Sequence, residues 1–590
     1  MRRLRTIVAL LVTALVFGCP SAAEKPDGEP SPAVKESTDA APSKETAEAP
    51  APETSPDDTL RTIVLVIDGL QPGDVRPGLA PELCRAAHCP GTTTPDPASH
   101  ATLYTQARAA MPTQTNPNHV AMMTGEYGAR SGLVGNAFYN RTLQQAQRME
   151  DPALIGVPTI FDLFAAEPRG QSPPHPTKKG QSPFSETPSG DGTPRRKVGQ
   201  SLTAAVFGKE KLRKLFDCTR RGDGCGTSNA NPEEIFVTHV APDILKGSAE
   251  SPAPEGDDCP ADPAASYGVA QDACIMDRVI EIIDRDDPAF VFVNLGRVDF
   301  EQHAHGPGSP EADDAIKEAD RQVGRLVAHL KEKGLWVRTV LFVLSDHSFS
   351  RQSAEAPHVI DLDALFEADR KKRPRAWGTH GGLEQPYSVI TGGGAATVVL
   401  TDLRADARYL SPANAEALKR MREVALFARQ GRPRAGVSEA LYRIENPRDK
   451  GHTLSEVRPA WRIDSPRLGE LLVTAEAGKG DGKPGYVFAQ RDSFAARAPG
   501  NHGHPGTRHI PFVVVSGGDF VVDQIVEASN PAAINEADDT AALPEQAEVV
   551  DVAPTVLWLH GLLPPEANDA TALLPMAEGR VLREAFKEGW

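Results

Sequence analysis

Five short, almost wholly apolar runs, separated by longer stretches of mixed polarity, constrain the fold of this chain more than any other feature. They are Thr62–Ile67, Thr203–Phe207, Phe290–Leu295, Thr339–Leu344 and Phe512–Val515. Such β-branched runs, without alternation of polar and apolar residues, are typical of strands covered on both faces in a parallel sheet. Helical patterns lie between them. We therefore predict an α/β sandwich with a central, mostly parallel sheet covered by helices.

Polar residues follow several of these runs at the point where each run ends. Asp68 follows the first, Asp299 comes shortly after the third, and Ser345-Asp346-His347 follows the fourth. In open α/β sheets the carboxyl ends of the strands form the ligand crevice. We therefore expect these side chains to meet at one edge of the sheet.

Two of these clusters have the residue types of metal ligands. Asp299 and His303 are four positions apart, so one helical turn places both on the same face, where they can hold one metal ion. Asp346 and His347 follow a strand directly, and each can reach a metal. Taken singly, each cluster has an ordinary alternative, which is a buried histidine paired with a carboxylate or, at Asp68-Gly69, the start of a turn.

The first nineteen residues have the pattern of an export signal. Arg2, Arg3 and Arg5 precede an uncharged apolar run, Ile7–Phe17, which is too short for a permanent membrane span. The run ends in Gly18-Cys19 and resembles a bacterial lipobox, which implies a lipid on Cys19 and a membrane-anchored lipoprotein in the periplasm or at the cell surface. The alternative is a secretory signal cut nearby.

Residues 20–59 contain almost no bulky apolar side chains, so we predict a disordered tether. Residues 60–590 then form one large domain. Pro/Gly/Ser-rich stretches predict insertions at about 167–200 and 245–266, and mixed helix and strand patterns predict a cap at about 349–495.

Cysteines and charge narrow the possible functions. Beyond Cys19, six cysteines form close pairs, which in an oxidising compartment predict local disulfides: Cys84/Cys89, Cys218/Cys225 and Cys259/Cys274. The net charge of −17 is spread along the chain and aromatic residues make up only 6%, so no nucleic-acid-binding role is expected.

The order of the polar clusters along the chain is more specific than any one of them. It resembles the alkaline phosphatase superfamily, in particular the type I phosphodiesterase/nucleotide pyrophosphatase family. The matching pieces are Val66-Ile67-Asp68-Gly69, Pro112–His119, Thr124-Gly125, Gly135-Asn136, Asp299–His303, Ser345–His347 and Asn501-His502-Gly503. The resemblance implies an alkaline-phosphatase-like sandwich.

The start of one helix places Thr115 in a suggestive position. Pro117 suits a first helical turn and Asn116 suits the cap before it. Thr115 would then lie at a helix N-terminus, where free backbone N–H groups favour a phosphate.

The family resemblance implies a role for each residue at a two-metal site. One metal is held by Asp68, Asp346 and His347 with Thr115 itself, and the second by Asp299, His303 and His502. The resemblance thus implies two divalent ions. Mixed carboxylate and imidazole ligands suit zinc most simply, and these residue types also allow manganese or iron. Thr115 is then the nucleophile that forms a phosphothreonine, and Asn136 with the Thr115 N–H binds a non-bridging oxygen of a small phosphorylated substrate.

Some assignments remain open in the sequence. Gly378-Thr-His380-Gly-Gly is the alternative to His502 as the third histidine ligand, and His119 and His305 are expected to be structural. Lys209 and Lys211 resemble the lysine pair with which phosphonoacetate hydrolase holds its substrate carboxylate, although both also suit a solvated helix surface. Three functions follow: a phosphodiesterase or pyrophosphatase, a phosphonate or phosphate-monoester hydrolase, and a non-catalytic binding protein.

Overall fold

The computed structural model divides the chain into two units, Met1–Pro56 and Asp57–Trp590. All described residues belong to the second unit. They cover 60–165, 203–216, 235–239, 270–353, 358–382, 386–404, 406–478, 482–490, 493–527, 545–563 and 577–588. The predicted export signal with Cys19, the tether, both predicted insertions and the Cys218/Cys225 pair therefore lie outside the described residues.

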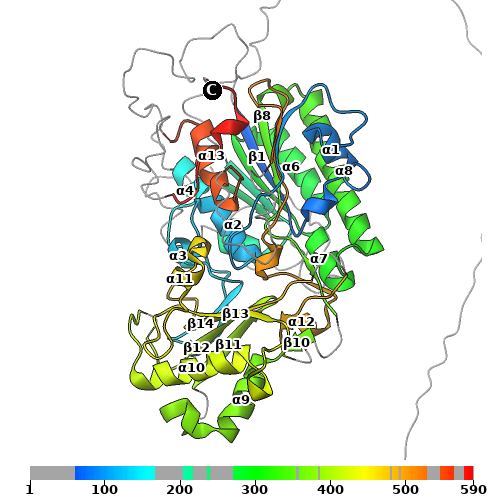
Figure 1. Cartoon of the computed structure of the whole chain (residues 1–590). Coiled ribbons are helices and arrows are strands. Elements are labelled where there is room, and N and C mark those ends of the chain that lie inside the picture. The colour runs from blue at the N-terminus through cyan, green and yellow to red at the C-terminus, as the bar shows by residue number, and fades with distance from the viewer. Residues whose placement is uncertain are drawn as a thin grey trace, which may run out of the picture. The chain divides into compact units, whose positions relative to one another are not determined.

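An eight-stranded sheet forms the centre of this unit (Figure 1). In spatial order its strands are β18 (Gln524–Val526), β2 (His100–Tyr104), β17 (Phe512–Ser516), β8 (Thr339–Leu344), β1 (Arg61–Ile67), β7 (Phe290–Leu295), β5 (Thr203–Phe207) and β6 (Ile235–His239). Strand β17 runs antiparallel to both of its neighbours, and the other pairs are parallel. The predicted fold class is confirmed.

All five apolar runs are strands with the predicted bounds to within one residue. The strands that the sequence did not predict are β2, β6 and β18, which lie at or next to the sheet edges. Residues of edge strands need not be apolar on both faces, and β2 and β18 lack the continuous apolar run of a central strand.

Helices cover both faces of the sheet (Figure 1). One layer contains α1 (Pro81–Ala87), α6 (Asp272–Asp286) and α8 (Pro310–Glu332). The other contains α2 (Thr115–Thr124), α4 (Ile160–Ala165) and α13 (Val552–Leu559). Alternate residues of β1 serve the two layers, because Leu65 clusters with Leu326 of α8 while Val64 clusters with Val120 of α2. This double coverage explains why β1 is apolar throughout.

A second, four-stranded antiparallel sheet lies in the interval predicted as the cap. Its order is β11 (Tyr387–Gly392), β12 (Ala395–Leu400), β14 (Leu471–Ala475) and β13 (Val437–Tyr442), and α9 (Leu362–Lys372) and α10 (Pro412–Leu426) pack against it (Figure 1). Strands β11 and β12 form a hairpin whose tip is Gly392–Gly394.

The remaining elements are short, apart from α7, which carries part of the site. They are α3 (Gly128–Ser131), β3 (Ala137–Asn140), β4 (Gln145–Arg148), α5 (Glu210–Phe216), α7 (Arg297–His305), β9 (Ser350–Arg351), β10 (Val359–Ile360), α11 (Leu454–Val457), β15 (Val487–Phe488), α12 (Phe494–Arg497) and β16 (Gly500–Asn501). None of the helices in the described ranges is long and apolar enough to cross a membrane.

The predicted disulfide between Cys84 and Cys89 is wrong, since both are buried free thiols. Their segment is already closed by the backbone, where the Cys89 N–H donates to the Cys84 carbonyl at 3.1 Å. Both side chains belong to the apolar cluster that includes Leu83. Cys274 is disulfide-bonded, while its predicted partner, Cys259, lies outside the described residues.

Candidate metal centre and nucleophile

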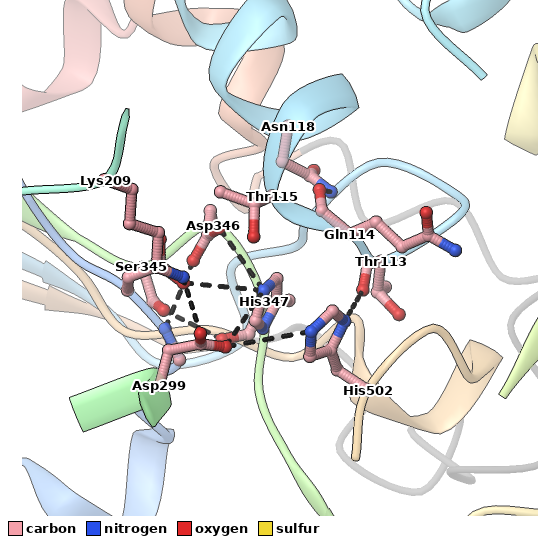
Figure 2. Close-up of polar contacts among 12 residues, drawn as sticks. Thr113, Gln114, Thr115, Asn118, Lys209, Asp299, Ser345, Asp346, His347 and His502 are labelled. Atoms are coloured by element: carbon pink, nitrogen blue, oxygen red, sulfur yellow. Dashed lines mark hydrogen bonds and ion pairs between the residues drawn. The ribbon is translucent and has the colours of Figure 1, made fainter. Parts of the chain in front are cut away.

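The candidate site lies at the carboxyl edge of the central sheet, beside the start of α2 (Figure 2). Parallel register aligns three strand ends there, because Val66 of β1 pairs with both Asn294 of β7 and Leu344 of β8. Asp68 and Asp346 therefore leave neighbouring strands at the same level. Helix α7 begins just after β7 and adds Asp299 on its first turn.

Helix α2 begins two residues earlier than the predicted cap allows. Gln114 is the N-cap, with extended backbone (φ −131°, ψ 156°), and Thr115 is the first helical residue. The assignment of Asn116 as cap is wrong, because its side chain instead donates to the Met149 carbonyl at 2.7 Å. Pro117 is still tolerated, since an N–H in the first turn has no intrahelical acceptor. Thr115 does lie at a helix N-terminus.

The Thr115 hydroxyl is buried and has no hydrogen-bond partner among the described residues. In Figure 2 it lies beside Asp346 and His347. The next backbone N–H, that of Asn116, donates to Asn136 Oδ1 at 3.0 Å. Because that oxygen is engaged, the Asn136 amide NH₂ is the end available to the pocket, which Asn136 lines. The arrangement offers a hydroxyl and an amide donor to one ligand.

The first ligand group consists of Asp299, His303 and His502. His303 Nδ1 donates to the Gly500 carbonyl at 3.1 Å, and His502 Nδ1 donates to the Thr113 carbonyl at 2.8 Å. A carbonyl only accepts, so both rings carry the proton on Nδ1 and present the Nε2 lone pair. His303 Nε2 lies 3.5 Å from Asp299 Oδ1, and His502 Nε2 lies 3.7 Å from the same oxygen. Hydrogen bonds of this kind orient histidine ligands of metals.

The second group lies around Asp68, Asp346 and His347, all fully buried. His347 Nε2 is 3.3 Å from Asp346 Oδ2 and 3.6 Å from Asp68 Oδ1. Burial lowers the pKa of His347 to about 4. The ring is therefore neutral near pH 7, which is the form that binds metals.

A buried hydrogen-bond chain joins Asp68 to the nucleophile helix. Asn294 Nδ2 donates to Asp68 Oδ2 and to His119 Nε2, both at 3.1 Å. His119 Nδ1 in turn donates to the Thr115 carbonyl at 2.9 Å. Burial lowers the pKa of His119 to about 3, which keeps it neutral. His119 thus has a structural place, as the sequence predicts.

Lys209 is almost wholly buried and bridges the two ligand groups. Its Nζ is 2.8 Å from Asp68 Oδ1 and 2.5 Å from Asp299 Oδ2. Burial acts to lower the pKa of Lys209, but attraction to Asp299 and Asp68 outweighs burial and raises the pKa. The solvated-surface interpretation is wrong for this lysine.

Lys211 lies close to Lys209 and lines the pocket. Burial and the neighbouring Lys209 lower its pKa to about 8. Within the described part of the chain, Lys211 forms no ion pair.

The donor set fits divalent metal ions. Several buried polar atoms lack a hydrogen-bond partner among the described residues: Thr115 Oγ1, Asp299 Oδ1, Asp346 Oδ2 and both ring nitrogens of His347. Leaving such atoms uncompensated is costly, so their concentration at one place indicates a ligand. Carboxylate oxygens and imidazole nitrogens are the donors that zinc takes.

Residues predicted as alternatives lie elsewhere. His380 is in the cap, 3.3 Å from Asp402, and His305 is exposed beside Glu301 at 3.4 Å. Sequence reasoning missed Thr113, Gln114 and Asn294, whose hydrogen bonds support the site. Only the position of Asn294 at the end of a strand could have drawn attention to it.

A pocket of about 410 Å³ opens beside the two ligand groups. Its lining mixes basic side chains with the acidic Glu150, Glu210 and Asp299, and part of it comes from the cap. Its lining includes Gln114, Asn136, Lys209, Lys211, Lys214, Arg148, Phe300, Phe494, Thr391, Gly392, Gly393 and His502.

The central sheet, the covering helices and this arrangement of donors define an alkaline-phosphatase-like protein. A structure of murine ectonucleotide pyrophosphatase/phosphodiesterase 5, an inactive threonine-to-alanine variant in complex with AMP, superposes with a TM-score of 0.51. The match covers 85% of this chain and 96% of the murine chain at 15% identity, so the likeness is one of fold.

Curated relatives match over shorter stretches. An uncharacterized pyrophosphatase/phosphodiesterase of Schizosaccharomyces pombe is 32% identical over 104 residues, or 17% of this chain and 21% of the relative. Ectonucleotide pyrophosphatase/phosphodiesterase family member 7 of Rattus norvegicus is 28% identical over 125 residues, or 20% of this chain and 28% of the relative. The chain thus spans less than a third of either relative's length.

The model of the type I phosphodiesterase/nucleotide pyrophosphatase family matches residues 62–503, which include every predicted ligand. The chain belongs to this family, as the order of its motifs predicts.

Proposed function

We propose that this protein is a metal-dependent hydrolase of small phosphate esters, of the phosphodiester or pyrophosphate type. Family membership supports phosphate-ester hydrolysis. The observation that carries the proposal is the buried, unpartnered Thr115 hydroxyl at a helix N-terminus, beside Asp346 and His347 in Figure 2.

In the proposed reaction, Thr115 Oγ1 attacks phosphorus, its bond to hydrogen breaks, and the ester oxygen leaves as an alcohol or phosphate. Water then cleaves the phosphothreonine and restores the hydroxyl. The Asn136 NH₂ and the Thr115 N–H bind a non-bridging oxygen of the phosphoryl group. Two divalent ions, which the donor set favours as zinc, would be bound here. Asp299, His303 and His502 would hold one, and Asp68, Asp346 and His347 the other. The ions would lower the pKa of the Thr115 hydroxyl and neutralise the charge that develops in the reaction.

The test is hydrolysis of three p-nitrophenyl substrates, a diester, a monoester and a phosphonate monoester, by protein lacking residues 1–59. Zinc content is measured in parallel. Diester preference with about two zinc ions per chain is the expected result. A protein that binds no zinc and turns over none of the substrates would instead be a binding protein.

Lys211 favours a second candidate, the hydrolysis of a phosphonate or monoester that carries a further anionic group. Its amine lines the pocket next to the ligand groups without an ion pair among described residues, and an unpaired cation there attracts a carboxylate or phosphate. Phosphonoacetate is the discriminating substrate, and Lys211→Met would raise its KM much more than that of the diester. Against this candidate, the murine structure that shares the fold is a complex with AMP, which favours a nucleotide ester as the substrate.

We further propose that the chain is exported and anchored through a lipid on Cys19. The support is the basic and apolar pattern of residues 1–19. Metabolic labelling with a palmitate analogue should mark the wild type and leave Cys19→Ser unlabelled, and labelling of both would contradict the assignment.

A further inference from the structure

The tip of the β11–β12 hairpin contacts two parts of the candidate site although it belongs to the cap. Gln114 Nε2 donates to the Gly392 carbonyl at 3.0 Å, and the Gly394 N–H donates to the His502 carbonyl at 2.7 Å. Both hydrogen bonds use only the backbone of the hairpin. Each reaches a residue next to, or within, the proposed catalytic machinery.

The contacts at this tip are too close for any side chain. A Cβ added at Gly393 would lie 2.2 Å from the His502 carbonyl oxygen and 2.3 Å from Asn501 Oδ1. One added at Gly394 would lie 2.2 Å from the His504 ring. Gly393 also has φ +68°, which favours glycine. The three glycines therefore let the cap backbone approach the His502 loop directly.

On its other side, the His502 loop is held by Thr113. The Thr113 carbonyl accepts a hydrogen bond from His502 Nδ1, as drawn in Figure 2. The Thr113 hydroxyl accepts a second one from the Gly503 N–H at 2.9 Å. The loop is thus held between the segment that precedes the nucleophile and the hairpin tip. This fixes where His502 Nε2 points.

Gln114 extends the hairpin contact to Asn136. While its Nε2 donates to Gly392, its Oε1 accepts from the Asn136 N–H at 2.7 Å. Asn136 Oδ1 is bound to the Asn116 N–H. The hairpin, through one glutamine side chain, therefore restrains the residue that offers its NH₂ group to the pocket.

We propose that the glycine tip Gly392–Gly394 is a positioning element of the active site, which orients the ligand His502 directly and the oxyanion-binding Asn136 through Gln114. The inference rests on the proposed function, because it assigns these two residues as its targets. The cap would then be a fixed wall of the catalytic site, and Gln114 a positioning residue.

The two contacts predict different losses, which a general loss of structure would not produce. Gly393→Ala pushes on His502, so zinc affinity should fall roughly 10- to 100-fold, the effect typical of lost outer-shell support. Gln114→Leu leaves His502 alone, so zinc affinity should stay at the wild-type value while inorganic phosphate binds the zinc-loaded protein roughly tenfold more weakly. The matched control is Gly382→Ala, also in the cap, where an added Cβ meets nothing within 4 Å.

The experiment is zinc titration against a chromogenic chelator, followed by calorimetry with phosphate, on protein lacking residues 1–59. Wild-type zinc affinity in a folded Gly393→Ala variant would overturn the role in placing His502. If that variant does not fold, Gln114→Leu still decides, since unchanged phosphate binding would overturn the hairpin's role at Asn136. Neither readout needs turnover, so a protein that binds zinc but hydrolyses nothing would sink the proposed function alone.

Discussion

The two sheets of this protein contribute to the site in different ways. The central sheet supplies side chains, since Asp68 and Asp346 each follow a strand that is fully buried on both faces. The cap sheet supplies backbone only, through a hairpin tip of glycines. Ligands must be placed to a fraction of an ångström, which favours rigid, close-packed strands. The hairpin tip only has to approach the His502 loop closely, and its backbone can do so without side chains.

The largest expected effect on turnover comes from changing the proposed nucleophile, which lies at the edge of the central sheet. Thr115→Ala should lower turnover by at least roughly a thousandfold, because the attacking oxygen is removed. Zinc content should stay near normal, since the carboxylate and imidazole donors remain. The exposed Thr142→Ala is the control in the same assay. Unchanged turnover in Thr115→Ala would remove this residue from its assigned role.

The two candidate histidines lie one in each region and can be compared directly. His502→Ala should weaken zinc binding by roughly a hundredfold or more, because one of three donors is lost from the group with Asp299 and His303. His380→Ala, in the cap beside Asp402, should bind zinc normally. Equilibrium dialysis measures both. The reverse ranking would move the third ligand into the cap.

Packing should differ between a central position of the main sheet and a position on an edge strand of the cap. Phe292 is fully buried in β7 and contacts the rings of His119 and Phe207. Phe292→Ala should lower the free energy of unfolding by about 3–5 kcal/mol. Val389, half-buried in β11 of the cap, should lose only about 1 kcal/mol when changed to alanine. Urea denaturation gives both values, and equal losses would show that Val389 is packed as tightly as Phe292.

The smallest expected effect concerns a carboxyl just after the nucleophile helix. Burial raises the pKa of Glu126 to about 8, with Arg130 acting in the opposite direction. The folded state then binds a proton that the unfolded state releases, so this contribution to stability is full below about pH 4.5 and declines as pH rises to about 8. Glu126→Gln cannot titrate and should flatten the decline. Urea denaturation at several pH values tests this, with the exposed Glu332→Gln as control. An unchanged pH profile in Glu126→Gln would contradict the assignment.

The polar clusters were predictable because each is local in the sequence. Asp299 and His303 share a helical turn, and Asp346 and His347 end a strand, so spacing alone places them within reach of one ion. The central strands were predictable for a similar reason, since burial on both faces leaves a continuous apolar run. Strands β2, β6 and β18, at or next to the sheet edges, were missed, and β2, next to the edge, carries no such run.

Contacts between distant segments could not be predicted in this way. Lys209 reads as a surface charge until the fold places it between Asp68 and Asp299. Asn116 suits a helix cap, yet Gln114 takes that position and the Asn116 side chain donates to the distant Met149 carbonyl at 2.7 Å. In each case the chain chooses among several locally acceptable partners.

The sequence by itself determined the class of fold and the chemical types of the ligands, because apolar periodicity and donor spacing act over a few residues. Only the tertiary structure decided which histidine faces Asp299, how Lys209 is paired, and that the glycine tip of the cap reaches His502 and Gln114. These depend on contacts between segments 90 to 278 residues apart. Their free energy is set by burial and by close approach, which only the packed chain defines.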